Sequence, residues 1–255
     1  MLEVAWTIIY LLVFFAGASI FSFLNVVIYR LPRKITYIKG RSRCPACGCE
    51  LKWYDMVPVL NWFYLRGRCR KCRAPVSFRY PAVETLGGVC AVLCAARFQM
   101  SVKSVLVFAL LAVLTVIAFI DIDTMEIPNG LVLEVLALGV LACVLLPECT
   151  PLQRLIGAFC VSVPMLLLAL AVPGAFGGGD IKLMAAAGLF LGWKMCVLAA
   201  FLAVVAGGIY GIYLLAAKKK DKKEHFAFGP FLCAGMAAAV FWGNEMISWY
   251  LSLYR

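Results

Sequence analysis

Long apolar stretches alternate with short polar connections along this chain of 255 residues, and one polar segment, 30–79, is much longer than the others. Several apolar stretches reach the ~20 residues that a helix needs to cross about 30 Å of hydrocarbon. The pattern predicts about eight transmembrane helices, of which the sixth is the weakest because it is short and rich in glycine and alanine. The expected spans are 4–29, 80–97, 102–121, 128–146, 153–172, 180–193, 194–216 and 228–252.

The composition agrees with this pattern. Hydrophobic residues make up 64% of the chain and its mean hydropathy is +0.95, whereas soluble domains contain roughly 45–50% apolar residues. A soluble fold cannot bury so much apolar surface in one core, but a lipid bilayer can solvate it. The predicted fold class is therefore an all-α polytopic membrane protein with a cytoplasmic loop module.

The formal net charge of +11 comes mainly from two segments. Thirteen of the 24 Lys and Arg residues lie in 30–79, and five more lie in 218–223. Each segment follows an apolar span, as the cytoplasmic loops of membrane proteins do. We interpret the charge as a topology signal and expect membrane lipid, but no nucleic acid, as a partner. This orientation puts both chain ends outside and the connections 122–127, 173–179 and 217–227 on the cytoplasmic side.

The long polar segment divides the chain into three expected parts. These are a first transmembrane helix at 1–29, a cytoplasmic module at 30–79 and a transmembrane domain at 80–255. Loops of this length without a function are uncommon. About fifty residues cannot build much of a hydrophobic core, so we expect a bound metal to stabilise this module.

Five of the twelve cysteines lie in the module, and four of them form two C-x-x-C pairs. The pairs are Cys44 with Cys47 and Cys69 with Cys72. Two such pairs about twenty residues apart are typical of a structural zinc site with four thiolate ligands. A loop on the reducing side of the membrane also favours metal binding over disulfides. The fifth, Cys49, is either a spare thiol or an alternative ligand.

A carboxylate stands at the expected start of the sixth span, where Asp180 follows three consecutive glycines, Gly177, Gly178 and Gly179. An unpaired carboxylate at the mouth of a transmembrane helix costs several kcal/mol. The glycines let the backbone approach a partner closely and leave the aspartate accessible. Asp180 either caps this helix or takes part in chemistry with a second group.

Asp121 is the candidate for that second group, because it ends a long apolar helix. Asp123 follows two residues later, and on a helix the two side chains point roughly 200° apart, so only one of them can face a site inside the bundle. The expected topology puts Asp121 and Asp180 at the same membrane boundary. Two carboxylates at one depth suit an aspartyl peptidase, in which one takes a proton from water and the other polarises the scissile carbonyl.

With these motifs the chain resembles the type 4 prepilin peptidases, which belong to the Gly-x-Gly-Asp class of intramembrane aspartyl proteases. The resemblance runs through nearly the whole chain. The segments that carry it are 17–32, the two C-x-x-C pairs, 53–58, 66–70, 79–84, 120–129 and 177–183.

The resemblance implies the roles of individual residues. The two catalytic aspartates of the family match Asp121, seven residues before Pro128, and Asp180 of the glycine motif. Its cysteine tetrad matches the two C-x-x-C pairs, Cys44, Cys47, Cys69 and Cys72. The resemblance implies that members with this loop are bifunctional enzymes. They cut a basic leader from prepilins or pseudopilins and then methylate the new N-terminal amine with S-adenosylmethionine. The substrates would belong to type IV pili or type II secretion, and the active site would face the cytoplasm from the inner membrane.

Two other functions stay open from the residues. The enzyme could lack methyl transfer, because the sequence has no glycine-rich nucleotide loop of the Rossmann type and that activity rests on the resemblance. From a different class, a cation-coupled transporter could use two carboxylates, although transporters more usually place them near the bilayer midplane and contain internal repeats. Three acidic residues, Glu50, Asp55 and Glu84, either contact the basic leader of a substrate or form hydrogen bonds within the loop.

Overall fold

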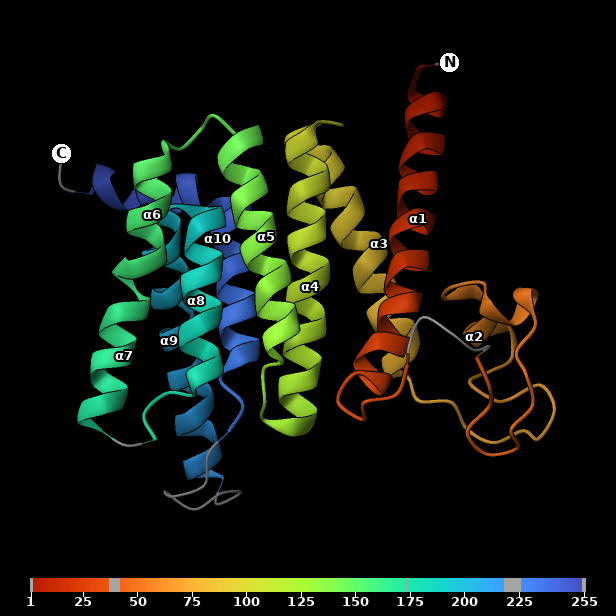
Figure 1. The fold of residues 1–255 in the computed structure, drawn as a ribbon. Helices are drawn as coiled ribbons and strands as arrows, with labels where there is room; N and C mark the ends of the chain where they lie inside the picture. Colours follow the sequence, from red (N-terminus) through yellow and green to blue (C-terminus); the bar gives the residue numbers. More distant parts are fainter. Residues whose placement is uncertain (1, 37–41, 173, 218–225, 254–255) are drawn as a thin grey trace. The chain divides into compact units, whose positions relative to one another are not determined.

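The structure, a computed structural model, describes residues 2–36, 42–172, 174–217 and 226–253 (Figure 1). Across these residues the regular secondary structure is helical, apart from two isolated β-bridges in the long loop. The basic segment 218–223 lies outside the described residues.

Every expected span has a helical counterpart, and most boundaries agree within a few residues. The helices are α1 (Leu2–Arg30), α3 (Arg79–Phe98), α4 (Val102–Thr124), α5 (Asn129–Leu145), α6 (Pro151–Cys160), α7 (Ser162–Ala171), α8 (Gly178–Leu191), α9 (Trp193–Ala216) and α10 (Gly229–Ser252). Among the described residues, six helical stretches are long and apolar enough to cross a membrane, with α6 and α7 taken together as one. The expected all-α polytopic membrane fold is confirmed, while α5 and α8 are shorter, at 17 and 14 residues.

The expected span 153–172 is interrupted in the structure. Helix α6 ends at Cys160 and α7 begins at Ser162, with Val161 between them. Pro164 lies in the first turn of α7 and has no N–H to donate to the carbonyl of Cys160, so a continuous helix cannot form there. The start of α6 is well defined, because Thr150 and Gln153 exchange side-chain hydrogen bonds with each other's backbone N–H groups.

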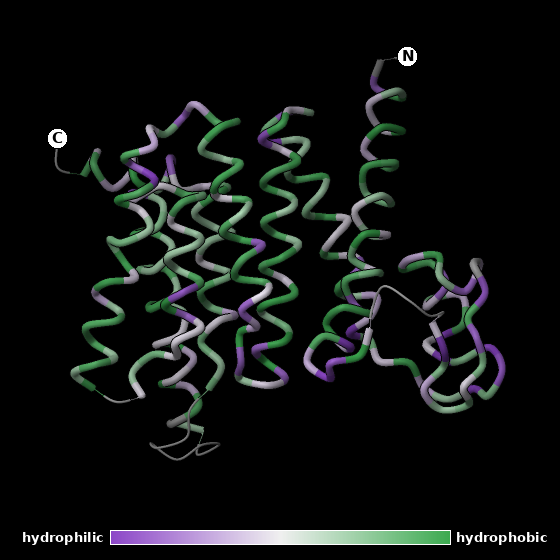
Figure 2. The backbone as a smooth tube through the Cα atoms, in the orientation of Figure 1, coloured by the Kyte–Doolittle hydropathy of each residue, from purple (hydrophilic) through white to green (hydrophobic). Residues whose placement is uncertain are grey.

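The chain divides into two compact units, 1–108 and 109–255, with the boundary inside α4. In the first unit α1 packs along α3, and Ala18 and Phe21 of α1 are fully buried. In the second unit α8 packs against α5, α6, α7, α9 and α10. Figure 2 shows hydrophobic residues along the length of these helices, whereas hydrophilic residues are frequent in the loop between α1 and α3.

Close packing fixes α8 within the second unit. A Cβ atom added at Gly188 of α8 would collide with the backbone of Gly157 in α6, so the two helices are closer together here than residues with side chains would allow. This agrees with the close helix packing expected for a G-x-x-x-G spacing. The other glycine of that spacing, Gly192, also lies close to Gly157 and ends α8 with a φ of +74°.

A buried arginine holds the far end of α8. Arg154 of α6 is 2% exposed and donates to the carbonyls of Leu189 and Phe190 at 3.2 and 2.6 Å. It also donates to the carbonyl of Leu146 at the end of α5, at 3.0 Å. Because the last carbonyls of a helix have no partner within the helix, one guanidinium group satisfies the ends of two helices.

The glycine contact between α6 and α8 gives a direct test of this packing. We expect Gly188→Ala to lower the melting temperature of the detergent-solubilised protein, because overpacking of this kind costs about 1–3 kcal/mol. Gly208→Ala in α9 is the matched control, because an added Cβ there meets nothing within 4 Å, and it should leave the melting temperature unchanged or raise it. Equal melting temperatures for the two variants would contradict the packing described.

Candidate functional site: a carboxylate pair and a four-cysteine cluster

Two buried carboxyl groups meet at one end of the second unit. Asp121 lies near the end of α4 and is 5% exposed, and Asp180 lies in the first turn of α8 and is 8% exposed. Helix α10 begins at the same end, where Gly229 contacts Asp121. The two aspartates that the sequence singled out are therefore brought together by the end of one helix and the starts of two others.

Each carboxyl group accepts a hydrogen bond from the backbone at the start of a helix. The N–H of Gly229, the first residue of α10, donates to Oδ2 of Asp121 at 2.9 Å. The N–H of Gly177, which precedes α8, donates to Oδ2 of Asp180 at 3.3 Å. Helix N-termini carry unsatisfied N–H groups and a partial positive charge, so both positions suit a negative group. Asp180 is the third residue of α8 and accepts from its N-cap residue, Gly177, so it contributes to the cap of this helix.

The neighbouring Asp123 points elsewhere. It lies two residues after Asp121 on the same helix and is exposed, whereas Asp121 is buried. This is the outcome expected from a separation of roughly 200° around a helix. The structure therefore brings Asp121, and not Asp123, together with Asp180.

The two carboxyl groups lie close enough for the charge of Asp121 to act on Asp180. The buried thiol of Cys233 in α10 is also within range of both charges. Within the described ranges neither aspartate forms an ion pair with a basic side chain.

Glycines allow the backbone to approach this site. A Cβ atom added at Gly229 would lie 2.6 Å from Oδ2 of Asp121, and one added at Gly179 would lie 2.9 Å from Cβ of Ile127. Of the three glycines in the motif, Gly179 has the closest approach. A Cβ at Gly177 would lie 3.2 Å from Oδ2 of Asp180, and one at Gly178 meets nothing within 4 Å. Lys182 of α8 donates to Oδ1 of Asn129 at 3.2 Å, so a second contact joins the start of α8 to the start of α5.

Aromatic side chains flank the carboxylate pair. Phe176, which precedes the glycine motif, lies 5.7 Å from Phe228, which precedes Gly229, measured between ring centroids. Phe231, Phe226 and Tyr210 extend this group, with centroids 5.4–6.4 Å apart. No role is expected for these aromatic side chains from the sequence. Phe176 and Phe228 each precede a glycine, which does not by itself reveal that two distant segments meet.

The second candidate site is the cysteine cluster of the first unit. The Sγ atoms of Cys44, Cys47, Cys69 and Cys72 all lie within 4.8 Å of one another. Four sulfurs bound to one tetrahedral zinc ion at about 2.3 Å would lie about 3.8 Å apart, and Cys44 and Cys72 are separated by 3.9 Å. The four residues predicted as ligands therefore form a cluster that could hold a metal ion such as zinc.

The cluster is built from two equivalent loops, which we call the first knuckle (43–50) and the second knuckle (68–75). In the first, the N–H of Cys44 donates to the carbonyl of Cys49 at 2.9 Å. In the second, the N–H of Cys69 donates to the carbonyl of Ala74 at 2.8 Å. Each knuckle is closed by one β-bridge, and each has a positive φ after its second cysteine, at Gly48 and Arg73. A shift of twenty-five residues along the chain relates every pair of equivalent positions.

Backbone N–H groups also favour the thiolate form of two of the four cysteines, Cys69 and Cys47. Donation from the N–H groups of Cys72 and Lys71 lowers the pKa of Cys69 to about 6. The N–H of Cys49 likewise lowers the pKa of Cys47. Metal ions bind the thiolate and not the thiol, so this geometry suits metal binding.

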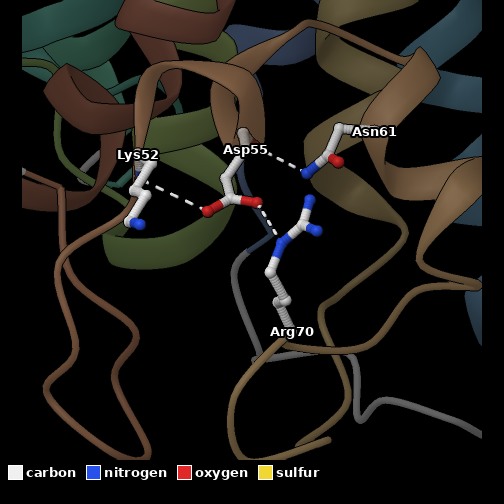
Figure 3. A network of polar contacts seen from close by, with 4 residues as sticks. All are labelled: Lys52, Asp55, Asn61 and Arg70. Atoms are coloured by element: carbon white, nitrogen blue, oxygen red, sulfur yellow. Dashed lines mark hydrogen bonds and ion pairs between the residues drawn. The ribbon is translucent and has the colours of Figure 1, made fainter.

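The segment between the knuckles is fixed by a polar network (Figure 3). Asp55 accepts from Nε of Arg70 at 2.7 Å and from the backbone N–H of Lys52 at 3.3 Å, while its carbonyl accepts from Asn61 at 2.7 Å. Arg70 lies between the two cysteines of the second knuckle, so Asp55 ties that knuckle to the short helices η1 (Trp53–Met56) and α2 (Leu60–Tyr64).

The other acidic residues considered for substrate contact are also engaged within the first unit. Glu50 pairs with Arg43 at 2.9 Å across the bridge of the first knuckle. Glu84 of α3 accepts from the N–H of Val59 at 2.8 Å. Val59 has a φ of +64°, which is rare for a β-branched residue, so Glu84 holds a strained turn in place. These contacts favour a role in folding the loop.

Together these features define a class: a multi-pass membrane protein with a carboxylate pair of the kind that aspartic peptidases use. Two family models match the chain: the Bacterial Peptidase A24 N-terminal domain over residues 15–98, and the Type IV leader peptidase family over residues 108–212. Relatives named prepilin leader peptidase/N-methyltransferase match over almost their full length. The chain belongs to the type IV leader peptidase family.

Three of these relatives illustrate the similarity. The protein of Legionella pneumophila is 32% identical over 96% of this chain and 95% of its own. The protein of Aeromonas salmonicida (strain A449) is 33% identical over 94% of this chain and 93% of its own. The protein of Bacillus subtilis (strain 168) is 30% identical over 95% of this chain and 98% of its own. No solved structure matches the chain significantly.

Proposed function

We propose that this chain cleaves the basic leader from prepilins or pseudopilins and then methylates the new N-terminal residue. The observation that carries the proposal is the pairing of Asp121 with Asp180 in a member of the type IV leader peptidase family. Relatives across 95% or more of this chain carry both activities in their names. Family membership does not favour the cation-coupled transporter.

The carboxylate pair performs the cleavage. One aspartate is ionised and takes a proton from a water molecule, while the other is protonated and polarises the scissile carbonyl. When the two carboxyl groups share a single proton, one is ionised and the other is protonated. Loss of that proton is then a property of the pair and not of either residue alone. The amides of Gly229 and Gly177 orient the two Oδ2 atoms, so the carboxyl groups need little reorganisation when the substrate arrives.

The substrate approaches from the cytoplasmic side in this proposal. The basic segments follow apolar spans and so predict that the ends of α4, α8 and α10 that carry the site face the cytoplasm of the inner membrane. A prepilin with an apolar helix could enter side-on from the bilayer, while its basic leader stays in the aqueous phase. The aromatic residues Phe176 and Phe228 next to the pair would contact apolar substrate residues near the scissile bond.

The four-cysteine cluster has a structural role in this proposal. Cys44, Cys47, Cys69 and Cys72 would hold one zinc ion, which completes a module too small for a hydrophobic core of its own. S-adenosylmethionine would supply the methyl group, a role that rests on family membership, and we assign no residues to its binding. We also propose the division into 1–29, 30–79 and 80–255, in which the middle part is this zinc module.

Substitution of the aspartates tests the cleavage mechanism. We expect Asp121→Asn and Asp180→Asn each to lower cleavage of a co-expressed prepilin at least about 100-fold, because each removes one partner of acid–base catalysis. Gel mobility of the prepilin measures cleavage, and mass spectrometry of its N-terminus measures methylation. The control Asp123→Asn should retain activity, since this residue is exposed. Full cleavage activity of Asp121→Asn or Asp180→Asn would refute the mechanism. If the native enzyme released an unmethylated product, the protein would be a peptidase without methyltransferase activity.

The backbone contact at Gly229 gives a second test. In Gly229→Ala the new Cβ would lie 2.6 Å from Oδ2 of Asp121, so the carboxyl group must shift. Displacements of about 1 Å can cost 100-fold in rate, and we expect a fall in cleavage of about 10–100-fold with normal membrane insertion. Gly208→Ala, in open space on α9, is the control. Unchanged cleavage by Gly229→Ala would show that the position of Asp121 is not critical.

Metal analysis tests the cysteine cluster. The purified protein should contain about one equivalent of zinc, and a content below about half an equivalent would count against the site. Removal of zinc by a chelator should expose the many Lys and Arg residues of 30–79 to trypsin, because metal binding and folding are coupled in small modules. Re-addition of zinc should restore protection.

A further inference from the structure

A fifth sulfur lies beside the four-cysteine cluster. The Sγ of Cys49 is 3.2 Å from the Sγ of Cys47 and also within hydrogen-bonding reach of Cys69. Two sulfurs on one tetrahedral zinc ion would be about 3.8 Å apart. Because four sulfurs already fill the tetrahedron and Cys49 lies beside Cys47, these two sulfurs would compete for one corner.

The fold of the first knuckle keeps Cys49 at this place. Gly48 has a φ of +69°, and the turn that it makes brings Cys49 back toward Cys47. The carbonyl of Cys49 accepts from the N–H of Cys44, so its backbone is part of the knuckle itself. Cys47 is exposed and Cys49 is half-buried.

The second knuckle provides an internal comparison. Its residue equivalent to Cys49 is Ala74, which is also half-buried and whose carbonyl accepts the corresponding hydrogen bond from Cys69. Alanine cannot bind a metal. The corner of Cys47 therefore has two sulfurs available, whereas the equivalent corner of Cys72 has one.

We propose that Cys49 is an alternate zinc ligand that takes the corner of Cys47 when Cys47 is oxidised, alkylated or removed. In this exchange the bond from zinc to the sulfur of Cys47 breaks, a bond to the sulfur of Cys49 forms, and the thiol proton of Cys49 passes to solvent. The inference rests on the proposed zinc role of the cluster and is independent of the peptidase chemistry. Its consequence is that the module keeps its metal despite damage to an exposed ligand.

Zinc affinity of single and double variants tests the exchange. The full-length protein in detergent is titrated with zinc in competition with a chromophoric chelator, and alanine replaces cysteine because a serine oxygen could itself bind the metal. We expect Cys47→Ala to stay within about tenfold of the native affinity. Cys72→Ala should bind zinc at least about 10–100-fold more weakly than the native protein. Loss of a group that only supports a metal ligand already weakens metal binding by that factor. The double variant Cys47→Ala/Cys49→Ala should be as weak as Cys72→Ala.

Cobalt substitution gives a second measurement that counts the thiolates directly. The intensity of sulfur-to-cobalt charge-transfer absorption depends on the number of thiolates bound to each ion. Cys47→Ala should retain the intensity of the native protein, while Cys72→Ala should lose about a quarter of it, because three of four thiolate ligands remain.

The reciprocal substitution uses the equivalence of the two knuckles. Ala74→Cys places a thiol in the second knuckle where the first has Cys49. Added to Cys72→Ala, it should restore zinc affinity and cobalt absorption toward native values. Restoration would show that the position, and not only the residue, provides the alternate ligand.

Two results would overturn the inference in distinguishable ways. If native protein binds zinc but Cys47→Ala is as weak as Cys72→Ala, and loss of Cys49 weakens it no further, Cys49 is not an alternate ligand. If native protein binds neither zinc nor cobalt, the zinc site fails together with this inference. Neither result affects the dyad of Asp121 and Asp180, which is tested by prepilin cleavage.

Discussion

The site depends on the need to stabilise two buried carboxyl groups at one end of an apolar helix bundle. Asp121 and Asp180 are buried, and each is held through Oδ2 by a backbone N–H at the start of a helix. Such N–H groups have no partner within their own helix, and the helix dipole adds a favourable field. The arrangement therefore requires α8 and α10 to begin at the end of α4, with glycines at both contacts.

The position of α8 is consequently decided by its neighbours. At 14 residues it rises about 21 Å, less than the roughly 30 Å of a hydrocarbon core, so its own length does not fix its depth. Glycine contact with α6 and the bonds from Arg154 hold its far half, while Lys182 and Gly179 join its start to the beginning of α5. A helix fixed along its length presents its aspartate at a defined place.

The loop module follows a different principle, since it has little apolar material to bury. Two equivalent knuckles present four sulfurs at distances suited to one tetrahedral ion, and the link from Asp55 to Arg70 fixes the segment between them. The acidic residues of this segment, Glu50 and Asp55, both pair with basic residues of the same segment.

The sequence by itself determined the helices, the membrane class, both candidate aspartates and the four cysteines, because hydrophobic length and C-x-x-C spacing are local properties. Only the tertiary structure decided how these residues meet. It interrupted the span 153–172 at Val161, buried Asp121 while leaving Asp123 exposed, and brought Gly229 to Asp121 across 108 residues of chain. It also placed Cys49 beside Cys47 and not at a separate corner. These outcomes depend on contacts between distant segments, and neither local propensity nor spacing along the chain encodes such distances.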